Sequence, residues 1–283
     1  MSELITGANG QLGQALREIY PEAVAIDHDE LDISNIEAVR HFDFSEIETI
    51  INAAAYTKVD EAETPEGMVA AFAANAQGVA NLAAIARERE LTLVHISTDY
   101  VFDGTKDAPY EETDPLSPIS VYGRSKAAGD LAAQSVANHY IVRTSWVIGE
   151  GSNFARTMLS LAEKGVDPSV VEDQIGRPGF TVDLAQAIDH LLKTAPEPGI
   201  YNCSNGGDPV SWADFAREIY RTAGYDAGRI SDTTTDEYFT GKTGIAPRPA
   251  NSVLLLDKLE ATGFICRDWR EALAEYITKE TSK

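Results

Sequence analysis

The sequence predicts an α/β protein built on a doubly wound parallel sheet, with a smaller cap formed by the C-terminal part of the chain. Three observations favour this fold class. Short apolar runs alternate with longer helical patterns over residues 1–147. A glycine-rich turn joins the first apolar run to the first helical pattern. Beyond residue 147 the alternation weakens, which indicates that the chain has left the repeating part of the sheet.

The first half of the chain supplies most of the expected sheet. Strands are predicted at residues 3–6, 23–26, 49–52, 91–98 and 140–143, and helices at 11–19, 70–89 and 122–136. Alternation at this length indicates βαβ units, in which parallel strands are joined by helices. Because such crossovers are right-handed, we expect helices on both faces of the sheet.

The second half is expected to divide between the sheet and the cap. A helix at 182–192 and a strand at 200–202 are predicted to return to the sheet, while helices at 212–223 and 269–278 belong to the cap. We therefore expect one domain at 1–147 and about 182–205, and a second at about 148–181 and 206–283.

The charge of the chain is strongly acidic. Asp and Glu number 45 against 23 Lys and Arg, which gives a formal net charge of −22. Such a field repels nucleic acids and anionic membranes, so we expect neither as a partner. It also repels phosphorylated small molecules, but in molar salt the screening length falls to about 3 Å. We therefore favour adaptation to concentrated salt, with an ordinary acidic, soluble protein as the alternative.

Composition also bears on location. With 43% hydrophobic residues the chain can bury a sizeable core, and we find no run of about 18 apolar residues that would predict a membrane span. Met1–Glu3 begins without a basic segment or a following apolar run, so we expect no secretory signal. Cys203 and Cys266 form neither a disulfide framework nor a metal motif. We expect a cytoplasmic protein that binds no structural metal.

Glycines at 7, 10 and 13 mark a candidate dinucleotide site between the first strand and the first helix. Gly7 permits a tight turn, Gly10 lets the backbone approach a pyrophosphate, and Gly13 lets the helix pack closely. The start of the helix offers unpaired N–H groups and partial positive charge to phosphates. The alternative is a glycine-rich turn that binds nothing.

Asp27 lies 20 positions after Gly7, at the end of the second predicted strand. A carboxylate there can accept hydrogen bonds from the adenosine ribose hydroxyls. It would also repel a 2′-phosphate, which favours NADH over NADPH. The alternative is a surface Asp. The small residues 52–57, after the third strand, would let a ribose and phosphates lie close to the backbone, or would serve only in helix–sheet packing.

The candidate catalytic group combines Thr98, at the end of a strand, with Tyr122 and Lys126, which share one face of a helix. An ammonium beside a phenol favours the phenolate, so we expect Lys126 to lower a phenol pKa that is about 10 in water. Tyr122 could then exchange a proton with a substrate oxygen that Thr98 also holds. The alternative is a surface Tyr and Lys, because this spacing alone is common.

Together these motifs resemble the extended short-chain dehydrogenase/reductases, which have a Rossmann-like fold, and within them the dTDP-4-dehydrorhamnose reductases. The blocks that carry the resemblance run in order through the chain: residues 7–13, 52–57, 59–63, STDYVFDG at 97–104, 122–126, 143–147, 173–174 with Gly176, and 248–252. Their number and order make chance agreement implausible.

The resemblance implies roles for particular residues. The catalytic residues would be Thr98, Tyr122 as proton donor, and Lys126, which would also hold the nicotinamide ribose. The cofactor would lie against Gly7, Gly10, Gln11, Leu12, Gly13, Asp27, Asp32, Ile33, Ala55, Tyr56 and Thr57, with Tyr122 and Lys126. The sugar would meet Thr98, Asp99 and Trp146. Arg248 is a candidate for the diphosphate, because a guanidinium can grip phosphate oxygens in pairs. A core Trp and a surface Arg are the alternatives for the last two.

The implied reaction is reduction of dTDP-4-dehydro-β-L-rhamnose at C4 to dTDP-β-L-rhamnose. The resemblance implies NADH or NADPH as cofactor. Some members are described with Mg²⁺, for which the sequence shows no ligand cluster. The cap would bind the nucleotide-linked sugar, and the assembly could be a homodimer. A dehydratase is disfavoured because Tyr100 follows Asp99 where an acid is usual. An epimerase, a reductase of another 4-ketosugar, and a regulatory subunit remain alternatives.

Overall fold

The computed structural model describes residues 2–282, and its largest element is a six-stranded parallel sheet in the order β10-β5-β4-β3-β1-β2. The strands are β1 (Glu3–Thr6), β2 (Val24–Ile26), β3 (Thr49–Asn52), β4 (Thr92–Thr98), β5 (His139–Thr144) and β10 (Gly199–Asn202). The order reverses between β1 and β3, because β2 pairs with one side of β1 while β3, β4 and β5 extend from the other. The structure confirms the predicted doubly wound sheet.

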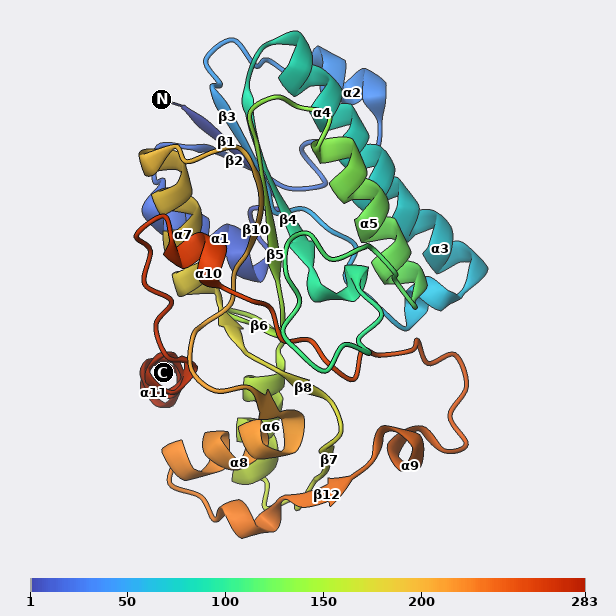
Figure 1. Ribbon diagram of the computed structural model, residues 1–283, viewed down its shortest axis with the longest axis vertical. Coiled ribbons are helices and arrows are strands. Elements are labelled where there is room, and N and C mark those ends of the chain that lie inside the picture. Colours follow the sequence, from blue (N-terminus) through green and yellow to red (C-terminus); the bar gives the residue numbers. More distant parts are fainter. Residues whose placement is uncertain (1, 283) are drawn as a thin grey trace.

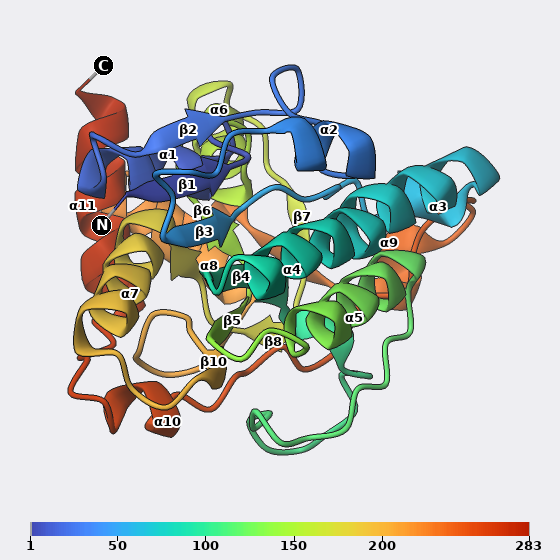
Figure 2. The same cartoon turned by 90° about the horizontal axis from the view of Figure 1, so that it is seen from above.

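Helices cover both faces of this sheet (Figures 1 and 2). α1 (Gln11–Ile19) and α7 (Thr181–Thr194) lie together on one face, whereas α2 (Ile36–His41), α4 (Val79–Glu88) and α5 (Val121–Ala133) lie on the other. Alternate strand residues serve the two faces. Leu4, Ile50, Leu93 and Ile141 pack towards α2 and α4, and their neighbours Ile5, Ile51, Val94 and Val142 pack towards α1 and α7. Burial on both faces explains why the strands are apolar runs without alternation.

The helical segment Pro65–Glu88 differs from its prediction. It begins at α3 (Pro65–Phe72), where the Thr64 side chain accepts a hydrogen bond from the Gly67 N–H, and it passes through a π-helical turn, η2 (Ala73–Gly78), before α4. By length and composition this segment is apolar enough to cross a membrane. The prediction that no segment is apolar enough for a membrane span was therefore wrong. In the fold its apolar face is used internally, since Leu82 and Ile85 are buried against the sheet.

The rest of the chain forms a second layered body below the sheet in Figure 1. Its helices are α6 (Phe154–Glu163), α8 (Trp212–Thr222), α9 (Thr235–Phe239) and α11 (Trp269–Thr281), with α10 (Asp257–Glu260) back beside the sheet. Its strands are β6 (Val147–Ile148), β7 (Ser169–Val171), β8 (Ile175–Gly176), β9 (Gly179–Phe180), β11 (Val210–Ser211) and β12 (Ser231–Thr233). A separate apolar core, which includes Met158, Phe215 and Trp269, joins α6, α8 and α11.

Short 3-10 turns complete the chain: η1 (Glu61–Glu63), η3 (Asp99–Val101) and η4 (Ala227–Arg229). The predicted helix at 11–19 and the strands at 3–6 and 49–52 have the bounds that the structure shows. The other predicted elements are shifted by a few residues at their ends. The helices α2, α6, α9 and α10 were not predicted. The two-stranded sheets outside the central sheet were not predicted either, because strands of two or three residues show no periodicity.

Candidate active site

Two adjoining cavities lie at the carboxyl ends of the central strands, where ligands bind in open α/β sheets. The first, of about 520 Å³, lies beside the glycine turn. The second, of about 470 Å³, is lined by Thr98, Tyr122, Lys126 and others. The two share three lining residues, Gly10, Ala53 and Ala55. A ligand that spans both would therefore run from the glycine turn to the Tyr122 hydroxyl region.

The glycine turn has the geometry that a close backbone approach requires. Gly7 has a φ of +72°, and a Cβ on it would lie 2.6 Å from the Ala54 Cα. A Cβ on Gly13 would lie 2.1 Å from the Gly7 carbonyl oxygen, so only glycine lets α1 pack against the turn. Gly10 is the N-cap of α1 and lines both cavities. Gly13 lines neither, so its part is to hold the turn in place.

The first cavity has acidic residues at its outer end. Asp27 Oδ2 accepts a hydrogen bond from the Asn9 N–H at 2.9 Å, and Oδ1 accepts from the His28 N–H at 2.7 Å. Asp32 and Ile33 line the same cavity. Among the described residues, no Lys or Arg lines it. The cavity can thus offer hydrogen-bond acceptors to ribose hydroxyls, but it presents no cationic side chain to an additional phosphate.

The loop after β3 is held by a residue that sequence reasoning missed. Ala55 and Thr57 line the catalytic cavity, and Tyr56 lines the first one. Asn75, in the π-helical turn, accepts from the Tyr56 N–H at 2.8 Å and donates to the Tyr56 carbonyl oxygen at 3.0 Å and to Ser125 Oγ at 3.0 Å. π-Helical turns often occur at functional sites. The sequence feature that could have pointed to this residue is a polar Asn within a helix rich in Ala.

β4 and α5 bring the three predicted catalytic residues together. β4 ends at Thr98, and α5 begins at Val121, where the Ser120 side chain caps the helix. This cap places Tyr122 in the first turn and Lys126 one turn later, and both residues line the cavity that Thr98 also reaches. Lys126 Nζ donates to the Ile96 carbonyl oxygen at 2.5 Å.

The protonation of this group differs from the prediction. Burial and the nearby Asp99 raise the pKa of Tyr122 above its ordinary value, while contact with Thr98 lowers it. The expectation that the pKa of Tyr122 is lowered was therefore wrong, because burial and the negative charge of Asp99 both disfavour the phenolate. Burial also lowers the pKa of Lys126 to about 8. At neutral pH the pair is a protonated phenol beside an ammonium, so the phenol carries a proton that it can donate to a strongly basic alkoxide oxygen.

Asp99 is buried beside these residues. Its Oδ1 accepts from Thr98 Oγ1 at 3.0 Å, and its Oδ2 accepts from Ser252 Oγ at 2.5 Å. Burial raises the pKa of Asp99 to about 6. Ser252 reaches the site from the C-terminal segment and was not among the predicted site residues, although it belongs to the block 248–252 that carried the resemblance.

Trp146 follows β5 and lines the catalytic cavity. Its φ is +46°, which is a strained conformation for a bulky residue. Its ring stacks on Trp212 with centroids 3.6 Å apart and planes 13° apart. Gly176 makes room for this ring, since a Cβ there would lie 2.6 Å from Trp146 Cε2. Strain held in place by stacking is typical of a residue that a site requires.

Arg248 is placed differently from the other predicted substrate residues. Its guanidinium forms two hydrogen bonds with the Asp60 carboxylate, at 2.5 and 2.9 Å. It lines a third cavity, of about 370 Å³, rather than the catalytic cavity. Tyr100 lines both, so the third cavity borders the second. Arg248 thus lies along the path towards the cap, with its charge already paired.

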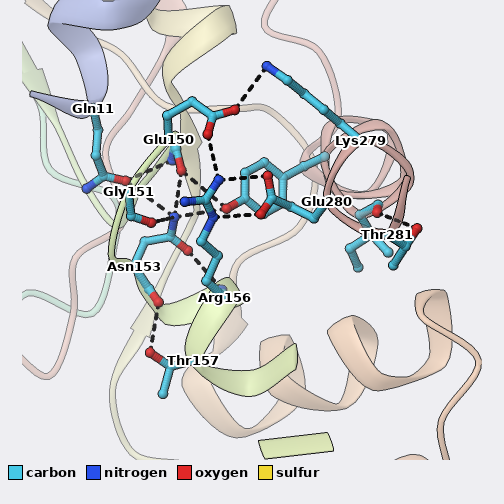
Figure 3. Close-up of polar contacts among 12 residues, drawn as sticks. Gln11, Glu150, Gly151, Asn153, Arg156, Thr157, Lys279, Glu280 and Thr281 are labelled. Carbon is cyan, nitrogen blue, oxygen red and sulfur yellow. Dashed lines mark hydrogen bonds and ion pairs between the residues drawn. The ribbon is translucent and has the colours of Figure 1, made fainter. Parts of the chain in front are cut away.

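Gln11 and Leu12 line the catalytic cavity, and the Gln11 side chain also ties the glycine turn to the cap (Figure 3). Its Oε1 accepts from the Gly149 N–H at 2.9 Å. Asn153 Nδ2 donates to the Gly149 carbonyl oxygen at 2.7 Å and lies 3.0 Å from Tyr276 Oη, on α11. This network fixes the start of α1 relative to α6 and α11.

Within residues 2–282 no group of three or more His, Cys, Asp or Glu side chains could hold a metal ion.

The raised pKa of Asp99 predicts a pH-dependent stability. The neutral carboxyl stabilises the fold fully below the ordinary pKa of 3.8, and this contribution is lost as pH rises through about 6. A shift of this size corresponds to about 3 kcal/mol. Asp99→Asn does not titrate. Denaturant unfolding should therefore show the free energy of unfolding of the variant, relative to the parent, rising by about 3 kcal/mol between pH 4 and pH 7. If the free energies of unfolding of parent and variant changed with pH in parallel, the burial of an ionisable Asp99 would be contradicted.

Comparison with known proteins agrees with this geometry. Residues 1–282 match the family described as "RmlD substrate binding domain". A dTDP-4-dehydrorhamnose reductase of Aggregatibacter actinomycetemcomitans is 40% identical, over 95% of this chain and 96% of that protein. A dTDP-4-keto-6-deoxy-D-glucose reductase of Streptomyces niveus is also 40% identical, over 96% of this chain and 95% of that protein.

A solved structure matches as well. The crystal structure of dTDP-4-dehydrorhamnose reductase from Bacillus anthracis in complex with NADP has a TM-score of 0.89 and 36% identity, and the match covers 98% of this chain and 99% of that one. With a family match over nearly its whole length and relatives of 40% identity, this chain belongs to the RmlD substrate binding domain family.

Proposed function

We propose that this protein reduces the C4 keto group of dTDP-4-dehydro-β-L-rhamnose to give dTDP-β-L-rhamnose, with NADH or NADPH as the reductant. One observation carries the proposal: the cavity that contains Tyr122 and Lys126 shares Gly10 and Ala55 with the cavity at the glycine turn. A dinucleotide on the glycine turn would thus bring its nicotinamide to the phenol. The relatives named as reductases of dTDP-linked 4-ketosugars support the choice of substrate.

The residues of the chain divide the chemistry between them. The reduced nicotinamide supplies hydride to the carbonyl carbon. Tyr122 donates a proton to the carbonyl oxygen, and its raised pKa keeps that proton available at neutral pH. Thr98 donates a hydrogen bond to the same oxygen by turning its hydroxyl proton away from Asp99. Lys126 holds the nicotinamide ribose hydroxyls, and its positive charge favours the phenolate that Tyr122 becomes after proton transfer.

The substrate would extend from the catalytic cavity towards the cap. Trp146 offers an apolar ring edge to the deoxyhexose, and Asp99 accepts a sugar hydroxyl. Arg248 binds the diphosphate by exchanging the Asp60 carboxylate for phosphate oxygens. The cap, at about 148–181 and 206–283, carries the nucleotide, and the domain at 1–147 and about 182–205 carries the cofactor.

A second candidate is the reduction of another dTDP-linked 4-keto-6-deoxysugar. The relative from Streptomyces niveus, named for a different 4-ketosugar, is as similar as the relative named for rhamnose. Purified protein offered a panel of such sugars with NADH and NADPH would separate the two candidates by the loss of nicotinamide absorbance. We further propose that the protein works in the cytoplasm as a homodimer. Its acidic charge supports the proposal that it binds neither nucleic acid nor anionic membrane.

Tyr122→Phe removes the proton donor without changing the shape of the cavity. We expect turnover to fall by about 10²–10⁴-fold, the usual contribution of a general acid, with cofactor affinity nearly unchanged. Tyr140→Phe is a matched control, because the Tyr140 hydroxyl donates to the Pro196 carbonyl oxygen, away from the cavities. Steady-state rates and cofactor binding would be measured together. A Tyr122→Phe variant as fast as the control would rule out this mechanism.

Asp27 should make the protein prefer NADH, since its carboxylate would lie beside the additional phosphate of NADPH. We expect Asp27→Asn to raise the ratio of kcat/KM with NADPH to that with NADH by roughly tenfold, which corresponds to about 1.4 kcal/mol of relieved repulsion. Asp29→Asn is the matched control, because Asp29 is exposed and does not line the cavity. An equal change in both variants would show that general charge, rather than Asp27, sets the preference.

The net charge of −22 leads us to propose that the protein is adapted to concentrated salt. In molar KCl the repulsion among its acidic side chains is screened within about 3 Å. We expect both the unfolding temperature and the rate of reduction to rise from dilute buffer to molar KCl. Full activity and stability in dilute buffer would contradict the proposal.

A further inference from the structure

A second layer of buried polar side chains lies behind Lys126. Asp130 follows Lys126 by one helical turn on α5, as Lys126 follows Tyr122, so the three residues share one face of the helix. The Asp130 side chain is 0% exposed, and it faces β4 and β5 through contacts with His95 and Arg143. The proposed mechanism makes no use of this group.

Arg143 keeps the Asp130 carboxylate ionised. Arg143 Nε lies 3.1 Å from Asp130 Oδ2, and the Arg143 side chain is 1% exposed. A guanidinium does not lose its proton in a protein, so a buried one requires a negative partner. Burial raises the pKa of Asp130, but Arg143, the Ser97 hydroxyl and Lys126 all act in the opposite direction.

The other groups around this carboxylate are neutral. His95 Nε2 lies 3.8 Å from Asp130 Oδ1, and burial together with Lys126 lowers the pKa of His95 well below its ordinary value. Asn52 Nδ2 lies 3.2 Å from His95 Nδ1, which assigns the imidazole proton to Nε2, facing Asp130. Tyr122 is a protonated phenol at neutral pH because of its raised pKa. Asp130 is therefore ion-paired with Arg143 and acts on Lys126, one helical turn away, through its charge.

Lys126 lies in the same buried environment. Its ammonium donates a hydrogen bond to a backbone carbonyl oxygen, that of Ile96. Burial lowers the pKa of Lys126, and Asp130 acts against this effect. Without Asp130 the ammonium would lose this opposing effect, while the Arg143 guanidinium would remain buried nearby.

We propose that Asp130 is a positioning residue for the reduction: its carboxylate, held by Arg143, keeps Lys126 charged and directed towards the nicotinamide ribose without itself touching substrate or cofactor. This inference rests on the proposed function for its kinetic consequence. Its consequence for cofactor binding is independent of the sugar that is reduced.

The test is the pH dependence of Asp130→Asn. Because the Asp130 charge acts to raise the pKa of Lys126, its removal should shift the alkaline limb of kcat/KM to lower pH, by about one unit. The dissociation constant of NADH, followed by its fluorescence, should show the same shift. Asp130→Glu, which keeps the charge, should restore the parent limb in both measurements.

Asp183→Asn is the matched control. Asp183 is also largely buried and paired with an arginine, Arg267, but it lies on α7, on the opposite face of the sheet. We expect it to lose stability with no shift of the alkaline limb. If Asp130→Asn leaves Arg143 unpaired and does not fold, Asp130→Asn combined with Arg143→Met removes both buried charges. A smaller shift in the same direction is then expected, because loss of the Arg143 cation partly offsets the loss of the carboxylate.

Failure of the role of Asp130 can be told apart from failure of the proposed function. The role of Asp130 would be overturned if the alkaline limb of both kcat/KM and NADH binding stayed unshifted in folded Asp130→Asn or in the double variant. Shifted NADH binding in a protein that reduces no nucleotide-linked ketosugar would instead support Asp130 and refute the proposed function.

Discussion

The packing of α5 against the ends of β4 and β5 is the constraint on which the rest of the site depends. It buries a phenol, an ammonium and a carboxylate at successive turns of one helix, and the low polarity of that environment sets their protonation. Tyr122 keeps its proton because burial opposes the phenolate, and Lys126 keeps a charge that burial alone would weaken because Asp130 lies behind it. The site is thus prepared to donate a proton rather than to remove one.

The sheet brings this helix face to the cofactor cavity. Since the strand order reverses between β1 and β3, the loops after these strands diverge and leave room beside the glycine turn. Gly10 and Ala55 form the boundary between that room and the catalytic cavity. Trp146, just before the cap, lines the catalytic cavity, and Ser252, from the C-terminal segment, binds Asp99 there. Two separately packed cores thus meet at one set of strand ends, which is where chemistry between two ligands would occur.

Much of this arrangement could be predicted from the sequence. The sheet, its flanking helices and the meeting of Thr98, Tyr122 and Lys126 follow from local patterns and spacing. Contacts between distant segments could not be predicted: Asn75 and Ser252 bind groups that no local pattern connects to them. The pKa of Tyr122 was predicted in the wrong direction, because spacing indicates which charge is near but not how deeply the phenol is buried. The pairing of Arg248 with Asp60 depends likewise on tertiary structure.

The most direct test of a phenol poised beside reduced nicotinamide is the fate of the transferred hydrogen. Protein supplied with dTDP-4-dehydro-β-L-rhamnose and a reduced nicotinamide that carries two deuterium atoms at ring C4 would be followed by NMR of the sugar. We expect one deuterium at sugar C4, in a product formed in equal amount to the oxidised cofactor. Product without deuterium at C4, or unreduced sugar beside unchanged cofactor, would contradict the account.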